Sequence, residues 1–287
     1  MTSEASPRER AWADALASWA IPPSILDAAP ESPYGFPAEL FVRRAERSAG
    51  GDAHDEPTPT TRKALEALAA RGTVLDVGSG GGATSLPLAG RCDGLIAVDG
   101  QRDMLEAVSV TATRLGLHVT TVQGRWPDVA SETPPADVAV CGHVAYNAPD
   151  LGPFVRALSA HARRRVVLEL TDRHPWSWMN DLWLRFHGLA RPERPTADDA
   201  EALCLALGFD VHRDQRTDTE EGSGFERRDD AVALVRRRLC LPPTRDDEVA
   251  YALGARLSEH DGLWSSGPPE QLVITLWWDM REDTTAS

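Results

Sequence analysis

The sequence has little lysine, a shortage of positive charge and no long apolar run. Lys63 is the only lysine, and 44 acidic residues against 30 basic ones give a formal net charge of −14. A chain with this charge repels a phosphate backbone unless it segregates its basic residues, so we expect no nucleic-acid partner. None of its apolar runs is long enough to span a bilayer, so we expect no membrane association.

Cysteine is also scarce. The four cysteines, Cys92, Cys141, Cys204 and Cys240, lie far apart and form no C-x-x-C pair. This spacing is not that of a disulfide framework or of a zinc site, so we expect no metal and a reduced, cytoplasmic protein. Residues 1–7 lack the basic start and apolar core of a signal peptide, which agrees with that expectation.

What the sequence does contain is one strongly patterned stretch, from Thr73 to Asp99. An apolar run (Thr73–Val77) gives way to a glycine-rich turn (Gly78–Ala83), a helical run continues to Leu88, and a second apolar run ends at Asp99. This order predicts a strand–turn–helix–strand unit that binds a nucleotide-like cofactor. The glycines allow the backbone to approach a ligand closely, and the final acid can accept hydrogen bonds from both ribose hydroxyls.

Two cofactor patterns overlap in this turn. Gly78, Gly80 and Ala83, with an acid about 20 residues further on, fit the dinucleotide fingerprint G-x-G-x-x-G/A. Asp76 and Gly82 extend the same turn to the pattern D-x-G-x-G-x-G. The additional carboxylate suits a ligand with a positive ammonium and sulfonium, whereas it would repel a pyrophosphate. The sequence therefore favours S-adenosylmethionine, with a dinucleotide as the alternative.

In these residues the chain resembles the class I S-adenosylmethionine-dependent methyltransferases. The resemblance rests on Leu75–Gly82, on Ile96–Asp99 and on Met104–Leu105. It implies an α/β fold with a doubly wound, seven-stranded, mostly parallel sheet whose last strand is antiparallel. It also implies that the acid and the glycines face the methionine moiety, that Asp99 binds the ribose and that Met104 packs near the adenine. The cofactor-binding residues expected in this part of the chain are Asp76, Gly78, Ser79, Gly80, Gly82, Asp99, Gly100 and Met104.

Further cofactor contacts are expected at Arg125 and Trp126, after the third strand. The family often has an acid directly after the glycine that follows this strand, where it binds the adenine amino group. This chain has Arg125 after Gly124, so Asp128 or a backbone carbonyl would have to replace that contact. Trp126 either stacks on the adenine or lies tucked under the loop, and the sequence favours neither alternative.

Candidate catalytic residues follow the fourth and fifth strands. Ligands of a doubly wound sheet bind at the carboxyl ends of its strands, and the fourth strand runs into Gly142–Asn147. We expect Gly142 to let the backbone approach the cofactor, so that Gly142 and His143 both contact it. His143, Tyr146 and His174 are the candidate catalytic residues, with His143 beside the transferring methyl group.

Three other side chains near the fifth strand have open roles. Trp176 and Trp178 fall outside the helical apolar stripe that follows them, so they are candidates for the wall of an acceptor pocket. Glu169 alternates with apolar neighbours in the strand and points either into the cleft or into solvent.

Outside the core, Tyr34 and Phe36 either cover the cofactor or latch onto the core, and Arg236–Arg238 is expected to be a solvated face. The core itself should begin with a helix capped by Thr60 or Thr61. The four expected segments are a helical cap (1–58), a cofactor-binding Rossmann-like core (59–217), a helical insertion that acts as a lid or an oligomer contact (218–269), and the last core strand with the tail (270–287).

These patterns together predict an S-adenosylmethionine-dependent methyltransferase. A small-molecule acceptor with a nucleophilic O, N or C atom is favoured, because the acidic chain shows no basic aromatic groove for nucleic acid. The alternatives are a protein or tRNA methyltransferase, an S-adenosylmethionine-binding protein without activity, and a dinucleotide-dependent oxidoreductase. A homo-oligomer is compatible with the sequence.

Overall fold

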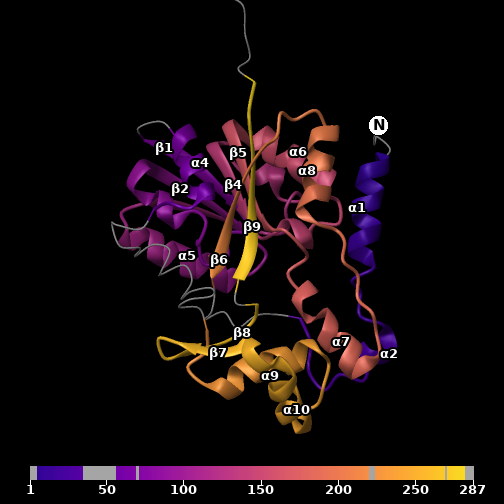
Figure 1. Ribbon diagram of the computed structural model, residues 1–287. Helices are drawn as coiled ribbons and strands as arrows, with labels where there is room; N and C mark the ends of the chain where they lie inside the picture. Colours follow the sequence, from indigo (N-terminus) through magenta and orange to yellow (C-terminus); the bar gives the residue numbers. More distant parts are fainter. Residues whose placement is uncertain (1–4, 35–55, 69–70, 220–223, 269, 282–287) are drawn as a thin grey trace, which may run out of the picture.

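A seven-stranded sheet forms the centre of the molecule in the computed structural model, which describes residues 5–34, 56–68, 71–219, 224–268 and 270–281 (Figure 1). Its strands are β1 (Gly72–Val77), β2 (Cys92–Asp99), β3 (His118–Gln123), β4 (Ala136–Gly142), β5 (Ala162–Thr171), β6 (His212–Thr219) and β9 (Glu270–Asp279). They lie in the order β3–β2–β1–β4–β5–β9–β6, and only β9 runs antiparallel to its neighbours. The predicted fold class is confirmed.

Helices cover both faces of the sheet. One face carries α4 (Pro59–Ala67) and α5 (Arg102–Arg114), and the other carries α1 (Pro7–Ala17), α6 (Leu151–His161) and α8 (Ala197–Ala206). Strands that are buried on both faces need apolar side chains at nearly every position, and β4 and the second half of β5 are buried in this way. This burial explains why these strands appear in the sequence as continuous apolar runs.

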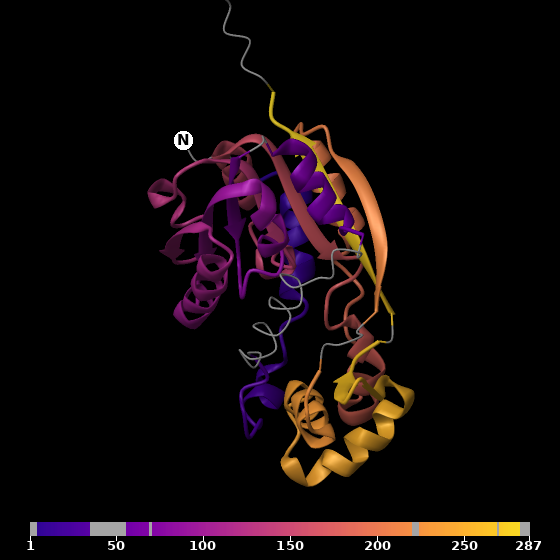
Figure 2. The same cartoon turned by 90° about the vertical axis from the view of Figure 1, so that its left-hand side faces the viewer.

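A smaller helical lobe lies beyond the carboxyl ends of the parallel strands, as both views show (Figures 1 and 2). It contains α2 (Pro23–Leu26), α7 (Asn180–His187), α9 (Arg228–Arg238) and α10 (Asp246–Leu253). These helices come from three separate parts of the chain and share one apolar core, which includes Ile21, Leu182, Trp183, Val235 and Val249. The insertion therefore packs against residues of the expected helical cap (1–58) and of the expected core segment (59–217).

The lobe also contains a hairpin that the sequence analysis did not predict. Strands β7 (Leu257–His260) and β8 (Leu263–Ser266) pair in antiparallel fashion across Asp261 and Gly262, which both have positive φ angles. An Asp-Gly pair between short strands is a strong hairpin signal, so this element was visible in the sequence.

Two predicted helix starts differ from the structure. The turn after Gly82 continues into a 3₁₀ helix, η1 (Leu86–Arg91), and not into an α-helix. Thr58 caps α4, since its hydroxyl accepts from the Thr61 amide at 3.1 Å. Thr60, one of the two expected caps, instead points its hydroxyl toward the sheet and hydrogen-bonds Thr275 of β9 at 2.7 Å.

Two strands of the sheet have polar residues near their starts: β5 includes Arg163–Arg165, and β6 begins at His212. The remaining short 3₁₀ helices are η2 (Ala130–Glu132), η3 (Ala145–Asn147), η4 (Ser177–Met179), η5 (Pro243–Arg245) and η6 (Gly254–Arg256). The expectation for Phe36 falls on residues outside the described ranges.

The predicted solvated face at Arg236–Arg238 is wrong for two of its three arginines. Arg236 and Arg238 are only 5% and 4% exposed. Arg236 forms ion pairs with Glu31 and Asp246 at 2.7 and 3.0 Å, and the Arg238 guanidinium lies 4.8 Å from the centroid of the Trp176 ring. Buried arginines are stable where their charges are paired, and here the pairs join α9 to α10 and to the segment after α2.

No helix within the described ranges combines the length and the apolar character that crossing a membrane requires.

Candidate active site

The glycine-rich turn lies at the carboxyl end of β1 and bends sharply under the end of β2. Gly78, Gly80 and Gly82 have φ angles of +70°, +49° and +93°, which glycine adopts without steric cost. The amides of Gly78 and Ser79 donate to the Val98 carbonyl at 2.8 and 3.0 Å. A Cβ atom on Gly78 would come within 2.2 Å of a Val144 methyl carbon, so the turn also packs closely on the segment that follows β4.

Asp76 lies directly beneath this turn and is fully buried. One carboxylate oxygen accepts from the Ser85 hydroxyl at 2.5 Å, whereas the other, Oδ1, has no hydrogen-bond partner among the described residues. The pKa of Asp76 is raised to about 7, because burial and, to a smaller extent, the negative charge of Asp99 raise it more than the Ser85 hydrogen bond lowers it. A buried carboxylate with an unused oxygen is suited to a cationic group such as the ammonium of a methionine moiety.

Asp99 connects the end of β2 to the glycine turn. Its Oδ2 accepts from the Gly80 amide at 2.9 Å and its Oδ1 from the Gln101 amide at 2.8 Å. The carboxylate is only partly buried, and each oxygen can accept more than one hydrogen bond, so ribose hydroxyls can still bind there. Next to it, Gly100 is exposed and Met104 is buried against the core.

We expect Asp99→Ala to weaken S-adenosylmethionine binding by about 1.5–3 kcal/mol, the range for hydrogen bonds to a charged group. Isothermal titration calorimetry measures the change. Asp103→Ala is the matched control, because Asp103 is an exposed acid on the first turn of α5 and its loss should leave the affinity unchanged. Unchanged affinity in a folded Asp99→Ala variant would rule out the ribose assignment.

Arg125 and Trp126, the two cofactor contacts expected after the third strand, lie in different environments. Arg125 is exposed, as is Asp128. Trp126 is 5% exposed, its Nε1 donates to the Phe154 carbonyl at 3.2 Å, and its ring meets His161 edge-on with the centroids 5.0 Å apart. Of the two alternatives for Trp126, this packing favours the tucked position under the loop.

His143 follows β4 in a conformation that is unusual for its residue type. Its φ angle is +59°, in the left-handed region that disfavours side chains with a Cβ atom. The preceding Gly142 packs against Thr84, whose Oγ1 would lie 2.2 Å from a Cβ atom at that position. The backbone amide of His143 donates to the Glu169 carbonyl at 2.8 Å, and its Nε2 lies 3.0 Å from Glu169 Oε1. Such strained residues tend to occur at functional sites.

Glu169 points neither into solvent nor into an open cleft, but toward His143 inside the protein. It is 6% exposed, and Oε2 accepts from the Thr60 hydroxyl at 2.5 Å and from Arg216 at 3.1 Å. Burial raises its pKa, but the hydrogen bond and charge of His143, with the charge of Arg216, outweigh this effect and lower the pKa to about 2. The carboxylate is therefore ionised at neutral pH. Sequence reasoning missed Thr60 and Arg216, and the only signal was an acid within an apolar strand.

Tyr146 and His174, the other candidate catalytic residues, have packing roles in this structure. The Tyr146 hydroxyl donates to the Thr171 carbonyl at 2.8 Å, and burial raises its pKa, so it is a poor proton donor or acceptor for a substrate. The His174 ring stacks on Trp19 with the centroids 3.9 Å apart. Burial, with the charge of Arg191, lowers the pKa of His174 to about 3, so its ring stays neutral.

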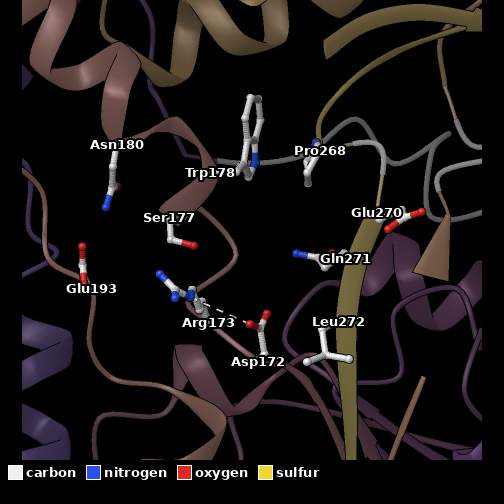
Figure 3. Close-up of a pocket in the computed structure, with 10 residues that line it drawn as sticks. All are labelled: Asp172, Arg173, Ser177, Trp178, Asn180, Glu193, Pro268, Glu270, Gln271 and Leu272. Carbon is white, nitrogen blue, oxygen red and sulfur yellow. Dashed lines mark ion pairs between the residues drawn. The ribbon is translucent and has the colours of Figure 1, made fainter. Parts of the chain in front are cut away.

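A pocket of about 380 Å³ opens at the carboxyl end of β5, beside the start of β9 (Figure 3). Ser177 and Gln271 extend toward each other across it, with Trp178 above them. The pocket thus contains Trp178, as expected for an acceptor wall, whereas Trp176 stacks with Tyr34 at a centroid distance of 6.1 Å. Its complete lining is Asp172, Arg173, Ser177, Trp178, Asn180, Glu193, Pro268, Glu270, Gln271 and Leu272.

In the part of the chain that the structure describes, no three His, Cys, Asp or Glu side chains lie close enough together to hold a metal ion. The four cysteines are all buried and unpaired.

Comparison with known proteins identifies the core. The family model described as "Methyltransferase domain" matches residues 74–165, which include the glycine turn, Asp99 and His143. The match covers 92 of the 287 residues of the chain. The prediction of an S-adenosylmethionine-dependent methyltransferase is thereby confirmed for this domain, whereas the acceptor is not determined by the match.

Relatives of the methyltransferase domain were found by sequence and by structure. A curated relative from Haemophilus influenzae, named as an uncharacterized protein, is 31% identical over 137 residues, which cover 46% of this chain and 49% of the relative. The match thus spans about half the length of that relative. The YcgJ protein of Bacillus subtilis has a TM-score of 0.49 at 18% identity, over 78% of this chain and 98% of its own.

A second solved structure is similar to the same degree. It is an S-adenosylmethionine-dependent methyltransferase from Geobacter sulfurreducens in complex with S-adenosyl-L-homocysteine, with a TM-score of 0.48 and 18% identity. The similarity covers 85% of this chain and 99% of that chain.

Proposed function

We propose that this protein transfers the methyl group of S-adenosylmethionine to a nucleophilic atom of a small-molecule acceptor. The observation that carries the proposal is the buried Asp76 carboxylate beneath the glycine turn, with one oxygen unused among the described residues. A dinucleotide would bring its pyrophosphate to the same turn, where a carboxylate opposes it. Bound S-adenosylmethionine supplies a methyl group already activated by its sulfonium.

The chain's own residues would have three tasks. Asp76 and the glycine turn hold the methionine moiety, and Asp99 holds the ribose. His143, fixed at the end of β4, lies where an acceptor must approach the cofactor. Because the leaving group is already activated, the protein mainly has to align the acceptor and exclude water.

A small acceptor is favoured over a nucleic acid by charge. The chain has a net charge of −14, and the pocket beside β5 has three acids, Asp172, Glu193 and Glu270, against one base, Arg173. Such a lining disfavours phosphates and suits a neutral or cationic ligand. We assign this pocket to the part of the acceptor that is remote from the methylated atom, with the helical lobe as its outer wall.

The test is an incubation of the protein with methyl-labelled S-adenosylmethionine and, in separate reactions, a metabolite extract, bulk tRNA and a protein extract. We expect label in a small product of the first reaction and none in the macromolecules. The Asp99→Ala variant serves as the matched control for cofactor-dependent labelling. Label only in tRNA or in protein would show that the acceptor is a macromolecule and not a small molecule. No label in any of the reactions would contradict the methyltransferase activity.

Filling the pocket should separate acceptor binding from cofactor binding. We expect Ser177→Trp to raise the acceptor KM by about tenfold or more, which corresponds to at least 1.4 kcal/mol of lost contact. The calorimetric affinity for S-adenosylmethionine should not change. Ser131→Trp, on an exposed residue of η2, is the control. A point substitution is preferable to deletion of the insertion, because deletion would expose Trp183 and the rest of the lobe core.

An unchanged acceptor KM in Ser177→Trp would show that the pocket does not bind the acceptor. A loss of cofactor affinity in that variant would mean that the pocket belongs to the cofactor site instead.

A further inference from the structure

Asp172 lies directly after β5, and its main chain is held on both sides. Its amide donates to the Leu272 carbonyl of β9 at 2.9 Å, and its carbonyl accepts from the Ala197 amide at the start of α8, also at 2.9 Å. These two hydrogen bonds fix the backbone from which the carboxylate projects. A ligand that binds this carboxylate therefore meets a preorganised group and loses little free energy to its ordering.

The carboxylate of Asp172 is also available to a ligand. It points toward the space between Ser177 and Gln271 in the pocket beside β5 (Figure 3). The Nε atom of Arg173 lies 3.8 Å away, which is beyond hydrogen-bond distance, and no other side chain in the described ranges donates to the carboxylate. Because the Asp172 side chain is 36% exposed, a molecule in the pocket can use these free acceptor positions.

The other charges of the pocket favour a cation next to Asp172. Glu193 and Glu270 also line it, and neither forms an ion pair with another residue that the structure describes. A cation in the pocket is attracted by all three acids and opposed only by Arg173, whereas an anion meets the reverse. The volume of about 380 Å³ suits an organic molecule.

The uncharged side chains of the lining suit the rest of such a ligand. The Ser177 hydroxyl and the Gln271 amide extend toward each other above Asp172, where both can accept hydrogen bonds from an N–H group (Figure 3). Trp178 supplies an apolar wall, and aromatic rings attract cations. Its indole already has the guanidinium carbon of Arg256 at 5.8 Å from the ring centroid.

We propose that the methyl acceptor carries a cationic nitrogen group, an ammonium or a guanidinium, and that Asp172 binds this group in the pocket. The inference rests on the proposed function and narrows its small-molecule acceptor to organic cations, with Asp172 as the residue that selects them. An ammonium ion has no lone pair with which to attack a methyl group. The bound cation therefore serves recognition, and the methylated atom lies elsewhere in the acceptor.

The first test repeats the labelling experiment on a fractionated metabolite extract. A cation-exchange column at neutral pH separates the organic cations from the neutral and anionic compounds. Each fraction is then incubated with methyl-labelled S-adenosylmethionine and the full-length protein, and parallel reactions without protein are the controls. We expect a labelled product from the cation fraction and none from the other compounds.

The second test uses Asp172→Asn and the acceptor purified from the cation fraction. Asparagine keeps the backbone hydrogen bonds but not the charge, so the acceptor KM should rise about 10- to 100-fold, the range for loss of a hydrogen bond to a charged group. Calorimetry should show unchanged affinity for S-adenosylmethionine. Asp172→Glu keeps the charge and should recover part of the loss. Asp210→Asn, at an acid whose side chain is 96% exposed, is the matched control and should leave the KM unchanged.

Salt provides a readout that does not depend on a variant. Because mobile ions screen the attraction between partly exposed charges, the acceptor KM of the wild type should rise with salt concentration. The rise should be smaller in Asp172→Asn, which has one charge fewer in the pocket. If that variant does not fold, a wild-type KM that stays constant with salt would overturn the inference.

The outcomes separate this inference from the proposed function. Failure to bind S-adenosylmethionine, or the absence of label in every fraction, would contradict the proposed function. Label only in neutral or anionic small molecules would leave the proposed function in place and overturn the cationic acceptor. A cationic acceptor with the same KM in the wild type and in Asp172→Asn would overturn the role of Asp172.

Discussion

Replacing His143 with alanine is expected to lower kcat by about 10²–10⁴-fold, the range for loss of a positioned general base. His143 directly follows β4, and its neighbour Val144 packs on Gly78 of the glycine turn. Glu169 holds His143 through its carbonyl, which accepts from the His143 amide, and through its carboxylate, which lies 3.0 Å from Nε2. Affinity for S-adenosylmethionine should be nearly unchanged, because the methionine and ribose contacts are assigned to Asp76 and Asp99. Steady-state kinetics with the identified acceptor, together with calorimetry for the cofactor, measure both quantities.

Two further variants make this result specific. His143→Asn keeps a residue that tolerates the left-handed conformation, so it should fold well and be equally inactive. Tyr146→Phe removes a hydroxyl that donates to the Thr171 carbonyl, so it should cost about 1 kcal/mol of stability with little effect on kcat. A small rate effect with a large stability loss in His143→Ala would instead make His143 structural.

Replacing Asp76 with asparagine is expected to stabilise the cofactor-free protein at neutral and alkaline pH while weakening cofactor binding by about tenfold or more. Burial raises the pKa of this carboxyl from its usual value of 3.8 to about 7. The folded state thus prefers the protonated form. Its contribution to stability is complete below about pH 4 and is lost as the pH rises through 7, by at most roughly 4 kcal/mol. Asparagine stays neutral and avoids that loss.

The measurement is denaturant unfolding of the wild type and of Asp76→Asn at pH 5 and pH 8, without cofactor. We expect the difference in unfolding free energy between the two proteins to move in favour of the variant at the higher pH. In the wild type, cofactor affinity should rise between pH 6 and pH 8, because an ionised carboxylate binds an ammonium better. A variant that is less stable than the wild type by a larger margin at pH 8 than at pH 5 would contradict this account of Asp76.

The sequence predicted those parts of the molecule that depend on neighbouring residues. The pattern from Thr73 to Asp99 contains two buried strands and the glycines that require positive φ angles, and the structure has all of them. The antiparallel last strand was also found, because its apolar run is continuous. Local errors were the α-helix expected after the turn, where the structure has a 3₁₀ helix, the hairpin at Asp261 and Gly262, which was missed, and the cap of α4, which is Thr58.

The sequence was less informative where function depends on distant contacts. Glu169 and Arg216 lie on β5 and β6, which only β9 separates in the sheet, so their side chains can reach each other. No local sequence pattern predicts that pairing. The burial of Arg236 depends on Glu31, 205 residues away in the chain. The helical lobe likewise takes its core from three separate segments, so an insertion that looked independent in the sequence shares Trp183 and Ile21 with the rest of the protein.

The most direct test of the account is a calorimetric titration of the wild type with S-adenosylmethionine and, separately, with NAD⁺. The buried Asp76 under the glycine turn and Asp99 at the end of β2 predict one site for S-adenosylmethionine and no heat from NAD⁺. Binding of NAD⁺ in the absence of binding by S-adenosylmethionine would contradict the central claim.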